Sequence, residues 1–154
     1  MSKPSSTLLR QLARRLPGGE MRLDDQTREA YAGDKWFASH LPDAVALPRS
    51  TRSVSRILAF ARRHRIPVTA RGAGHGYVGG CVPMHGGIVL SLERMKRIRE
   101  INPADFVAVV QAGVITAELQ AAVEAQGLFY PPDPASRANN SIGGNIATNA
   151  GGPR

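Results

Sequence analysis

The chain has 154 residues, of which 42% are hydrophobic and 21% charged, so it can bury one core or two small subdomains. Its formal net charge of +8 raises the question of nucleic-acid binding. Aromatic residues make up only 5%, and no helix-turn-helix or zinc-finger spacing occurs, so we expect solvated basic faces and no nucleic-acid partner. No apolar run approaches the roughly 20 residues of a membrane span, and no secretory signal pattern begins the chain. Cys81 is the only cysteine, which fits a cytoplasmic protein.

The first part of the chain predicts one helix and a polar stretch. Residues 6–16 form the helix, capped by a serine and stopped by Pro17. Its apolar face consists of Leu8, Leu9, Leu12 and Leu16. Residues 20–42 are irregular, with a short helix possible at residues 24–32. In this stretch we expect Trp36 and Phe37 to anchor the chain to the core.

Strands and helices then alternate. We expect strands at residues 43–47, 66–70, 87–92, 97–102 and 106–111, and helices at residues 51–63 and 116–125. The inward residues of the two helices are Val54, Ile57, Leu58 and Ala61, and then Ile115, Leu119, Ala122 and Val123. Residues 87–92 are nearly all apolar, as in a strand that is buried on both faces. Residues 97–111 predict a hairpin. The fold class is therefore α+β with short strands.

The most informative stretch follows the strand at residues 66–70 and is rich in glycine. Its five glycines are Gly72, Gly74, Gly76, Gly79 and Gly80. Glycine lets backbone N–H groups approach a ligand without a Cβ in the way, and successive N–H groups form a cradle for phosphate oxygens. A surface turn needs only one or two glycines. We therefore interpret residues 71–80 as a pyrophosphate loop.

This stretch also fits the G-x-G-x-x-G string, with Glu93 about twenty residues later, as in a Rossmann dinucleotide site. A Rossmann unit opens a helix at its third glycine. Here Pro83 and the Gly86-Gly87 pair would break a helix at that place. We therefore expect the loop to run from strand to strand, which excludes the NAD fingerprint.

A second stretch of small residues lies at residues 139–153, after the proline-rich segment 128–136. Its glycines and alanines leave space for a large ligand, and its Asn and Ser side chains offer hydrogen-bonding groups. Taken alone, a polar loop and a ligand site explain it equally well. Together with residues 71–80 the ligand site is favoured. We expect the two segments to fold against each other and share one groove.

These motifs together resemble the FAD-binding domain of the vanillyl-alcohol oxidase and p-cresol methylhydroxylase family, especially its glycolate oxidase and D-lactate or D-2-hydroxyglutarate dehydrogenase branch. The likeness covers roughly residues 31–154 and begins at Tyr31-Ala-Gly-Asp34. Its other parts are residues 68–80, 87–92, 101–103, 111–113, 130–134 and 141–152. The fold that the likeness implies is an FAD-binding α+β type with two small subdomains, of which the second is truncated.

In such proteins the first loop wraps the FAD pyrophosphate, and the second segment lines the ribityl chain and the flavin edge. Carried over residue by residue, the likeness implies that FAD contacts Arg71, Gly72, Ala73, Gly74, His75, Gly76, Tyr77, Gly79, Gly80, Gly113, Pro132, Asp133, Ser141, Ile142, Gly143, Gly144, Asn145, Ala147 and Asn149. Backbone amides suffice to hold two phosphates, and the loop contains no lysine. No metal site is expected.

His75 departs from the hydroxy-acid branch, where Thr or Asn is common. Arg71-Gly-Ala-Gly-His75 instead aligns with a string in relatives that resemble berberine bridge enzyme, whose histidine bonds covalently to the flavin. An imidazole can act as the nucleophile for such a bond. The alternative is a loop histidine that only hydrogen-bonds to cofactor or backbone. The residues around His75 follow the non-covalent branch.

The likeness implies that the domain continues beyond residue 154, so we expect an N-terminal fragment whose catalytic residues lie in the missing part. The expected divisions are residues 1–42 as a helical extension, 43–112 as the first FAD-binding subdomain, and 113–154 as the start of the second. The implied function is oxidation of a 2-hydroxy acid, with a small-molecule substrate and an electron acceptor. Two alternatives remain, which are an alcohol or sugar oxidase with FAD tethered to His75, and a non-catalytic flavin-binding module.

Overall fold

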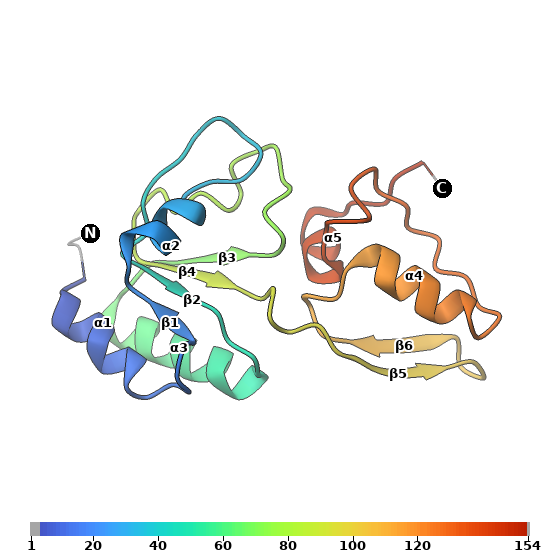
Figure 1. Ribbon diagram of the computed structural model, residues 1–154, viewed down its shortest axis with the longest axis horizontal. Coiled ribbons are helices and arrows are strands. Elements are labelled where there is room, and N and C mark those ends of the chain that lie inside the picture. The colour runs from blue at the N-terminus through green and yellow to red at the C-terminus, as the bar shows by residue number, and fades with distance from the viewer. Residues whose placement is uncertain (1–3, 154) are drawn as a thin grey trace.

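The computed structural model describes residues 4–153 and has the predicted α+β class. A four-stranded sheet with helices forms one half, and a hairpin with two helices forms the other (Figure 1). The chain passes from the first half to the second between β4 (Ile88–Ser91) and β5 (Ile98–Asn102). No helix among the described residues is long and apolar enough to cross a membrane.

The sheet has the strand order β1-β2-β4-β3, with β1 at Met21–Arg22, β2 at Ala44–Ala46 and β3 at Val68–Arg71. Strands β2, β4 and β3 are parallel, and β1 is antiparallel to β2. Every residue of β4 is buried, which confirms the prediction from its apolar sequence. As the central strand, β4 is covered on both faces.

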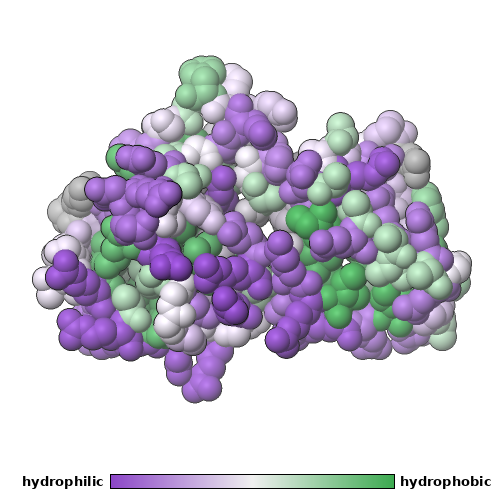
Figure 2. All heavy atoms as spheres, viewed as in Figure 1, coloured by the Kyte–Doolittle hydropathy of each residue, from purple (hydrophilic) through white to green (hydrophobic). Residues whose placement is uncertain are grey.

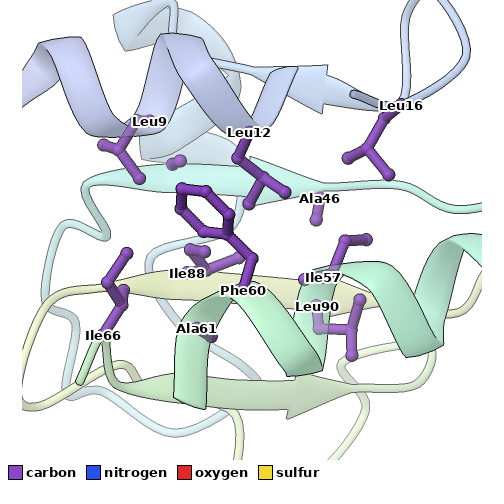
Figure 3. Packing of buried hydrophobic residues seen from close by; sticks show 11 residues of the cluster. Leu9, Leu12, Leu16, Ala46, Ile57, Phe60, Ala61, Ile66, Ile88 and Leu90 are labelled. Carbon is purple, nitrogen blue, oxygen red and sulfur yellow. The ribbon is translucent and has the colours of Figure 1, made fainter. Parts of the chain in front are cut away.

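Helices α1 (Ser6–Ala13) and α3 (Thr51–His64) cover one face of the sheet (Figure 1). Ser5 and Ser50 cap them, each with a side-chain oxygen that accepts a backbone N–H. Figure 3 shows the core between these helices and the sheet. Its labelled residues are Leu9, Leu12, Leu16, Ala46, Ile57, Phe60, Ala61, Ile66, Ile88 and Leu90. The prediction that Leu58 faces inward is wrong, because Phe60 takes that place and Leu58 is 44% exposed.

The other face of the sheet is covered by the segment after α2 (Asp25–Ala30), where Tyr31 packs on Val45 and Val89. The predicted anchoring of Trp36 and Phe37 in the core is wrong. Their side chains are 44% and 85% exposed, and the two rings contact each other at 4.3 Å between centroids. Large apolar residues in a polar stretch pack with each other here instead of reaching the sheet.

The second half contains the predicted hairpin of β5 and β6 (Val107–Val110), which pair antiparallel. It packs against α4 (Thr116–Glu124) and α5 (Ile142–Thr148) around Val114 and Leu119. No pattern in the sequence predicts α5, because two glycines and an asparagine, all poor helix formers, are among its seven residues. The structure also groups α1 and β1 with the parallel sheet and the hairpin with α4 and α5. The predicted divisions at residues 42 and 112 stay predictions.

Candidate functional site

The first glycine-rich segment, residues 71–80, connects the adjacent parallel strands β3 and β4 without a helix. This confirms that the loop runs from strand to strand. Gly74 and Gly79 both have φ of +72°, a conformation that residues with a Cβ rarely adopt. The tight turns of the loop therefore depend on glycine at these two positions.

The second segment begins with Ser141, which caps α5. The Ser141 Oγ accepts a hydrogen bond from the Gly144 N–H at 3.3 Å. The Gly143 N–H donates to the Ala112 carbonyl at 2.9 Å, and a Cβ on Gly143 would lie only 2.7 Å from the Ala112 Cβ. Glycine at position 143 thus lets α5 lie directly on the chain that leads from β6 to α4.

The two segments meet at Gly72. A Cβ built on Gly72 would lie 2.7 Å from the Ser141 Oγ and 3.5 Å from the Gly144 Cα, so only a hydrogen fits in this space. The predicted contact between the two segments is therefore confirmed. It joins the sheet half of the molecule to the hairpin half, and it places the backbones of both glycine-rich segments side by side.

The Arg71 side chain lies against the loop that it begins, because a Cβ on Gly74 would overlap its guanidinium. Its Nη1 donates to the Gly33 carbonyl, and its guanidinium lies 5.2 Å from the centre of the Tyr31 ring. A planar guanidinium suits both contacts, because it stacks on aromatic rings and donates in a fixed direction. The guanidinium of Arg71 thus fixes the start of the loop to the segment after α2. Its predicted contact with a cofactor stays a prediction.

Tyr31 is itself fixed by hydrogen bonds. Its hydroxyl donates to Glu93 Oε1 at 2.7 Å, and the Ser91 hydroxyl donates to Glu93 Oε2 at 3.0 Å. Burial, and after it the hydrogen bond to Glu93, raises the pKa of Tyr31 to about 12. The Tyr31 hydroxyl therefore keeps its proton at neutral pH. A chain of contacts from Ser91 to Arg71 supports the loop from the sheet side.

Asp34 lies under the loop, although only its place in the Tyr31–Asp34 motif signals it in the sequence. Its Oδ1 accepts the Trp36 N–H at 2.8 Å. Its Oδ2 is buried, has no hydrogen-bond partner among the described residues, and would lie 3.3 Å from a Cβ on Gly76. A buried oxygen that accepts no hydrogen bond lowers the stability of the fold. A donor bound at the loop would therefore find an acceptor in this carboxylate.

Cys81 follows the loop and is half-buried. Burial raises the pKa of its thiol, and the charge of Asp34 acts in the same direction. A thiol that keeps its proton is a poor nucleophile. The raised pKa therefore gives no support for a reactive thiol at Cys81.

Asn145 belongs to a buried network instead of facing open space. Its Nδ2 donates to the Thr116 hydroxyl at 2.7 Å, and that hydroxyl donates to the Asn140 Oδ1 at 2.6 Å. All three side chains are buried. The network ties α5 to the start of α4, so Asn145 positions the second segment from behind.

Three other predicted residues also make structural contacts. Asp133 is buried and forms an ion pair with Arg137 at 2.6 Å. The Pro132 carbonyl accepts the Gln120 side-chain amide at 2.9 Å. Gly113 is packed so closely that a Cβ would lie 2.3 Å from the Leu92 carbonyl oxygen. Their direct contact with a cofactor stays a prediction.

The remaining predicted residues differ in exposure. Ile142 is buried in the hairpin half of the core. The half-buried ones are Ala73, Gly74, His75, Gly76, Gly79, Gly143 and Gly144. The exposed ones are Tyr77, Gly80, Ala147 and Asn149. The contacts that build the junction itself come from Arg71, Gly72, Ser141, Gly143, Gly144 and Asn145. Within residues 4–153 no group of three or more His, Cys, Asp or Glu side chains could hold a metal ion.

A large hollow of the described chain lies away from this junction. It is an apolar groove of about 770 Å³ between the hairpin, α4 and α5, and it shares only Ile142 with the predicted site. Figure 2 shows hydrophobic residues gathered in this half of the molecule. The glycine backbone and the polar groups of the predicted site gather at the junction and not at this apolar groove.

The junction fits the diphosphate of a flavin nucleotide. The five glycines of residues 71–80 carry backbone N–H groups without a Cβ of their own, and Gly72 lies directly against Gly144. Such backbone N–H groups bind phosphate oxygens closely. The oxygen of Asp34 under the loop is a buried acceptor that still lacks a donor. The residues present therefore suit FAD, whose phosphates accept from amides and whose hydroxyl groups donate.

Comparisons with known proteins agree with this geometry. The family described as "FAD binding domain" matches residues 42–154. The glycolate oxidase subunit GlcD of Bacillus subtilis is 49% identical over 114 residues, which is 74% of this chain and 24% of that protein. The D-lactate dehydrogenase of Anaerostipes hadrus is 37% identical over 84% of this chain and 28% of that protein.

A solved structure shows the same fold. The 4-ethylphenol oxidase from Gulosibacter chungangensis, in its isoeugenol complex, is 30% identical, with a TM-score of 0.79 over 91% of this chain and 28% of that one. The chain thus spans about a quarter of the length of the relatives that it matches. It belongs to the FAD-binding domain family, and FAD is the cofactor of this domain.

Proposed function

We propose that this chain forms the flavin-holding part of an FAD-dependent oxidoreductase that oxidises a 2-hydroxy acid such as glycolate or D-lactate. The observation that carries the proposal is the junction at Gly72 and Ser141, where two glycine-rich backbones meet. The relatives support the choice of substrate, because two of them carry the names glycolate oxidase subunit and D-lactate dehydrogenase. The proposed protein is cytoplasmic and passes its electrons to a separate acceptor.

The chain's own groups would hold the cofactor in two ways. Amide N–H groups of residues 71–80 would donate to the phosphate oxygens, so that no lysine is needed. The N–H groups of Ile142, Gly143 and Gly144 already donate within the chain and hold the second segment beside this loop. The support of Arg71 by Tyr31 and Gly33 would keep the loop in the binding shape. When bound, FAD supplies the hydride acceptor for the substrate carbon.

Spectroscopy of the complete protein tests this proposal. Purified protein is expected to show the flavin absorption bands, and anaerobic addition of glycolate or D-lactate is expected to bleach them. L-lactate serves as the matched control, because it differs only in the configuration of the reacting carbon. If the protein is yellow and none of a panel of hydroxy acids bleaches it, it is a flavin-binding module instead. If no flavin binds at all, the assignment of the junction is wrong.

A further inference from the structure

The exposed surface formed by α1, the two residues after it and α3 carries arginines and no acidic residues. Its members, here called the arginine face, are Arg10, Arg14, Arg15, Arg52, Arg56 and Arg63. All six are exposed. Figure 2 shows hydrophilic residues along the edge of the molecule where these helices lie. The arginine face is on the opposite side of the sheet from Tyr31.

No carboxylate balances this charge from within the fold. Residues 4–19 and 44–92 contain no Asp or Glu. In the described part of the chain, the ion pairs Arg28–Asp25 and Arg137–Asp133 lie elsewhere, and none involves the arginine face. Like charges one helical turn apart, such as Arg52 and Arg56, destabilise a helix slightly. An anion from outside this part of the chain would relieve that repulsion.

The helix macrodipole explains only part of the pattern. Arg63 lies in the last turn of α3, where a cation is favourable. Arg52 lies in the first turn, which contains no acidic residue, and there a cation is unfavourable. Arg56, in the middle of the helix, gains nothing from the dipole. Helix stability alone therefore does not account for the stripe.

The arginine face surrounds a hollow of about 540 Å³ between the two helices. Its walls are Leu12, Arg15, Arg56, Ala59, Phe60 and Arg63. The Arg15 guanidinium lies 5.5 Å from the centre of the Phe60 ring. Figure 3 shows Leu12 and Phe60 pointing toward each other between the two helices. Arginines thus surround a floor made of apolar side chains.

We propose that this hollow is a docking site for an acidic segment of a partner protein, with an apolar side chain seated between carboxylates. Carboxylates match the forked donors of arginine, and the apolar floor would contact the side chain between them. A flat lipid surface would meet the rim but would not fill a hollow. The docking site lies apart from the Gly72 junction, so it does not depend on the proposed oxidation.

The probe is a fluorescein-labelled peptide in which glutamates flank a single phenylalanine. Its anisotropy is measured with the complete FAD-loaded protein at low and at physiological salt. We expect saturable binding that weakens with salt, because the contacts are between charges. Replacing the phenylalanine by alanine is expected to weaken binding several-fold, since the floor then loses its contact. Replacing the glutamates by glutamines is expected to abolish it.

Two protein variants of equal charge locate the site. The double variant Arg56→Gln with Arg63→Gln is expected to bind the peptide about tenfold more weakly, because it loses two charge contacts at the protein surface. The matched control, Arg97→Gln with Arg99→Gln, removes two exposed arginines from the hairpin half and is expected to bind like the parent. Arg56→Lys with Arg63→Lys retains the charge and serves as a second variant. It is expected to lose less affinity than the glutamine pair.

Several outcomes would overturn the docking site. They are an absence of binding, equal weakening by the hairpin pair, and equal affinity for the phenylalanine and alanine peptides. Vesicles of phosphatidylglycerol provide a further test. If vesicle binding depends on Arg56 and Arg63 while peptide binding does not, the arginine face is a membrane contact and the protein partner is wrong. None of these results bears on the proposed oxidation, which is tested separately by bleaching of the flavin with a hydroxy acid.

Discussion

The Oγ of Ser141 lies 2.7 Å from the position that a Cβ would occupy on Gly72. This closeness joins a loop after β3 to the cap of α5, and so it couples the two halves of the molecule. It also brings the backbones of both glycine-rich segments together. Substitutions at this junction therefore test the proposed flavin site.

Gly72→Ala is expected to destabilise the protein by about 1–3 kcal/mol, because the new methyl group overlaps the Ser141 hydroxyl. The loop must shift to relieve the overlap, so affinity for FAD should also fall. Urea unfolding and fluorescence titration of the apoprotein with FAD measure the two effects. Gly18→Ala is the matched control, since a Cβ there has no neighbour within 4 Å. Parent-like behaviour of Gly72→Ala would show that the junction is looser than described.

Ser141→Ala tests the same contact from the other side. Alone, it removes the cap of α5 and is expected to cost about 1 kcal/mol. It also removes the oxygen that the methyl group of Gly72→Ala would meet. In the Ser141→Ala background, Gly72→Ala should therefore cost less than in the parent. A double-mutant cycle of unfolding free energies measures this difference, and strict additivity would contradict the contact.

Asn145→Ala is expected to lower the free energy of unfolding by about 1–3 kcal/mol, because it leaves buried Thr116 and Asn140 with one partner fewer. Chemical denaturation measures the loss. The exposed Asn139→Ala variant is the control and should change stability little. If Asn145→Ala keeps full stability but loses FAD affinity, then Asn145 acts on the cofactor and not on the packing of α5.

The raised pKa of Tyr31 predicts that the protein loses stability at alkaline pH. Its pKa is raised to about 12 in the folded protein, against about 10 in an unfolded chain. The folded state therefore holds the proton more tightly, and this contribution is complete below about pH 10 and lost as the pH rises toward about 12. Urea midpoints across this range should fall less steeply for Tyr31→Phe than for the parent. Tyr77→Phe, at an exposed position, should follow the parent curve.

His75 gives a chemical prediction. Because the residues around it resemble the branch with dissociable flavin, acid precipitation of the complete protein should leave the yellow colour in the supernatant. A His75→Ala variant should behave in the same way and provides the control. Colour that stays with the parent's precipitate and is released in the variant would instead establish a covalent link through this histidine.

Much of the fold follows from local sequence patterns. The apolar residues of β4 and the alternation in β5 and β6 predict these strands, because burial on one or two faces leaves its period in the chain. Serines before α1 and α3 mark their starts, since a side-chain oxygen must satisfy the first free N–H groups. The five glycines of residues 71–80 predict close approach of backbone to a ligand.

Other features were decided by contacts between distant parts of the chain. The inward place of Phe60 depends on Leu12 of another helix, and the exposure of Trp36 depends on which segments reach the sheet. Helix α5 forms against local propensity because Ser141 caps it and Asn145 holds it to Thr116. The sequence by itself determined most of the elements, but not α5 or β1, and a likeness to FAD-binding proteins. Only the tertiary structure decided that Gly72 meets Ser141, because local periodicity carries no information on where a distant segment returns.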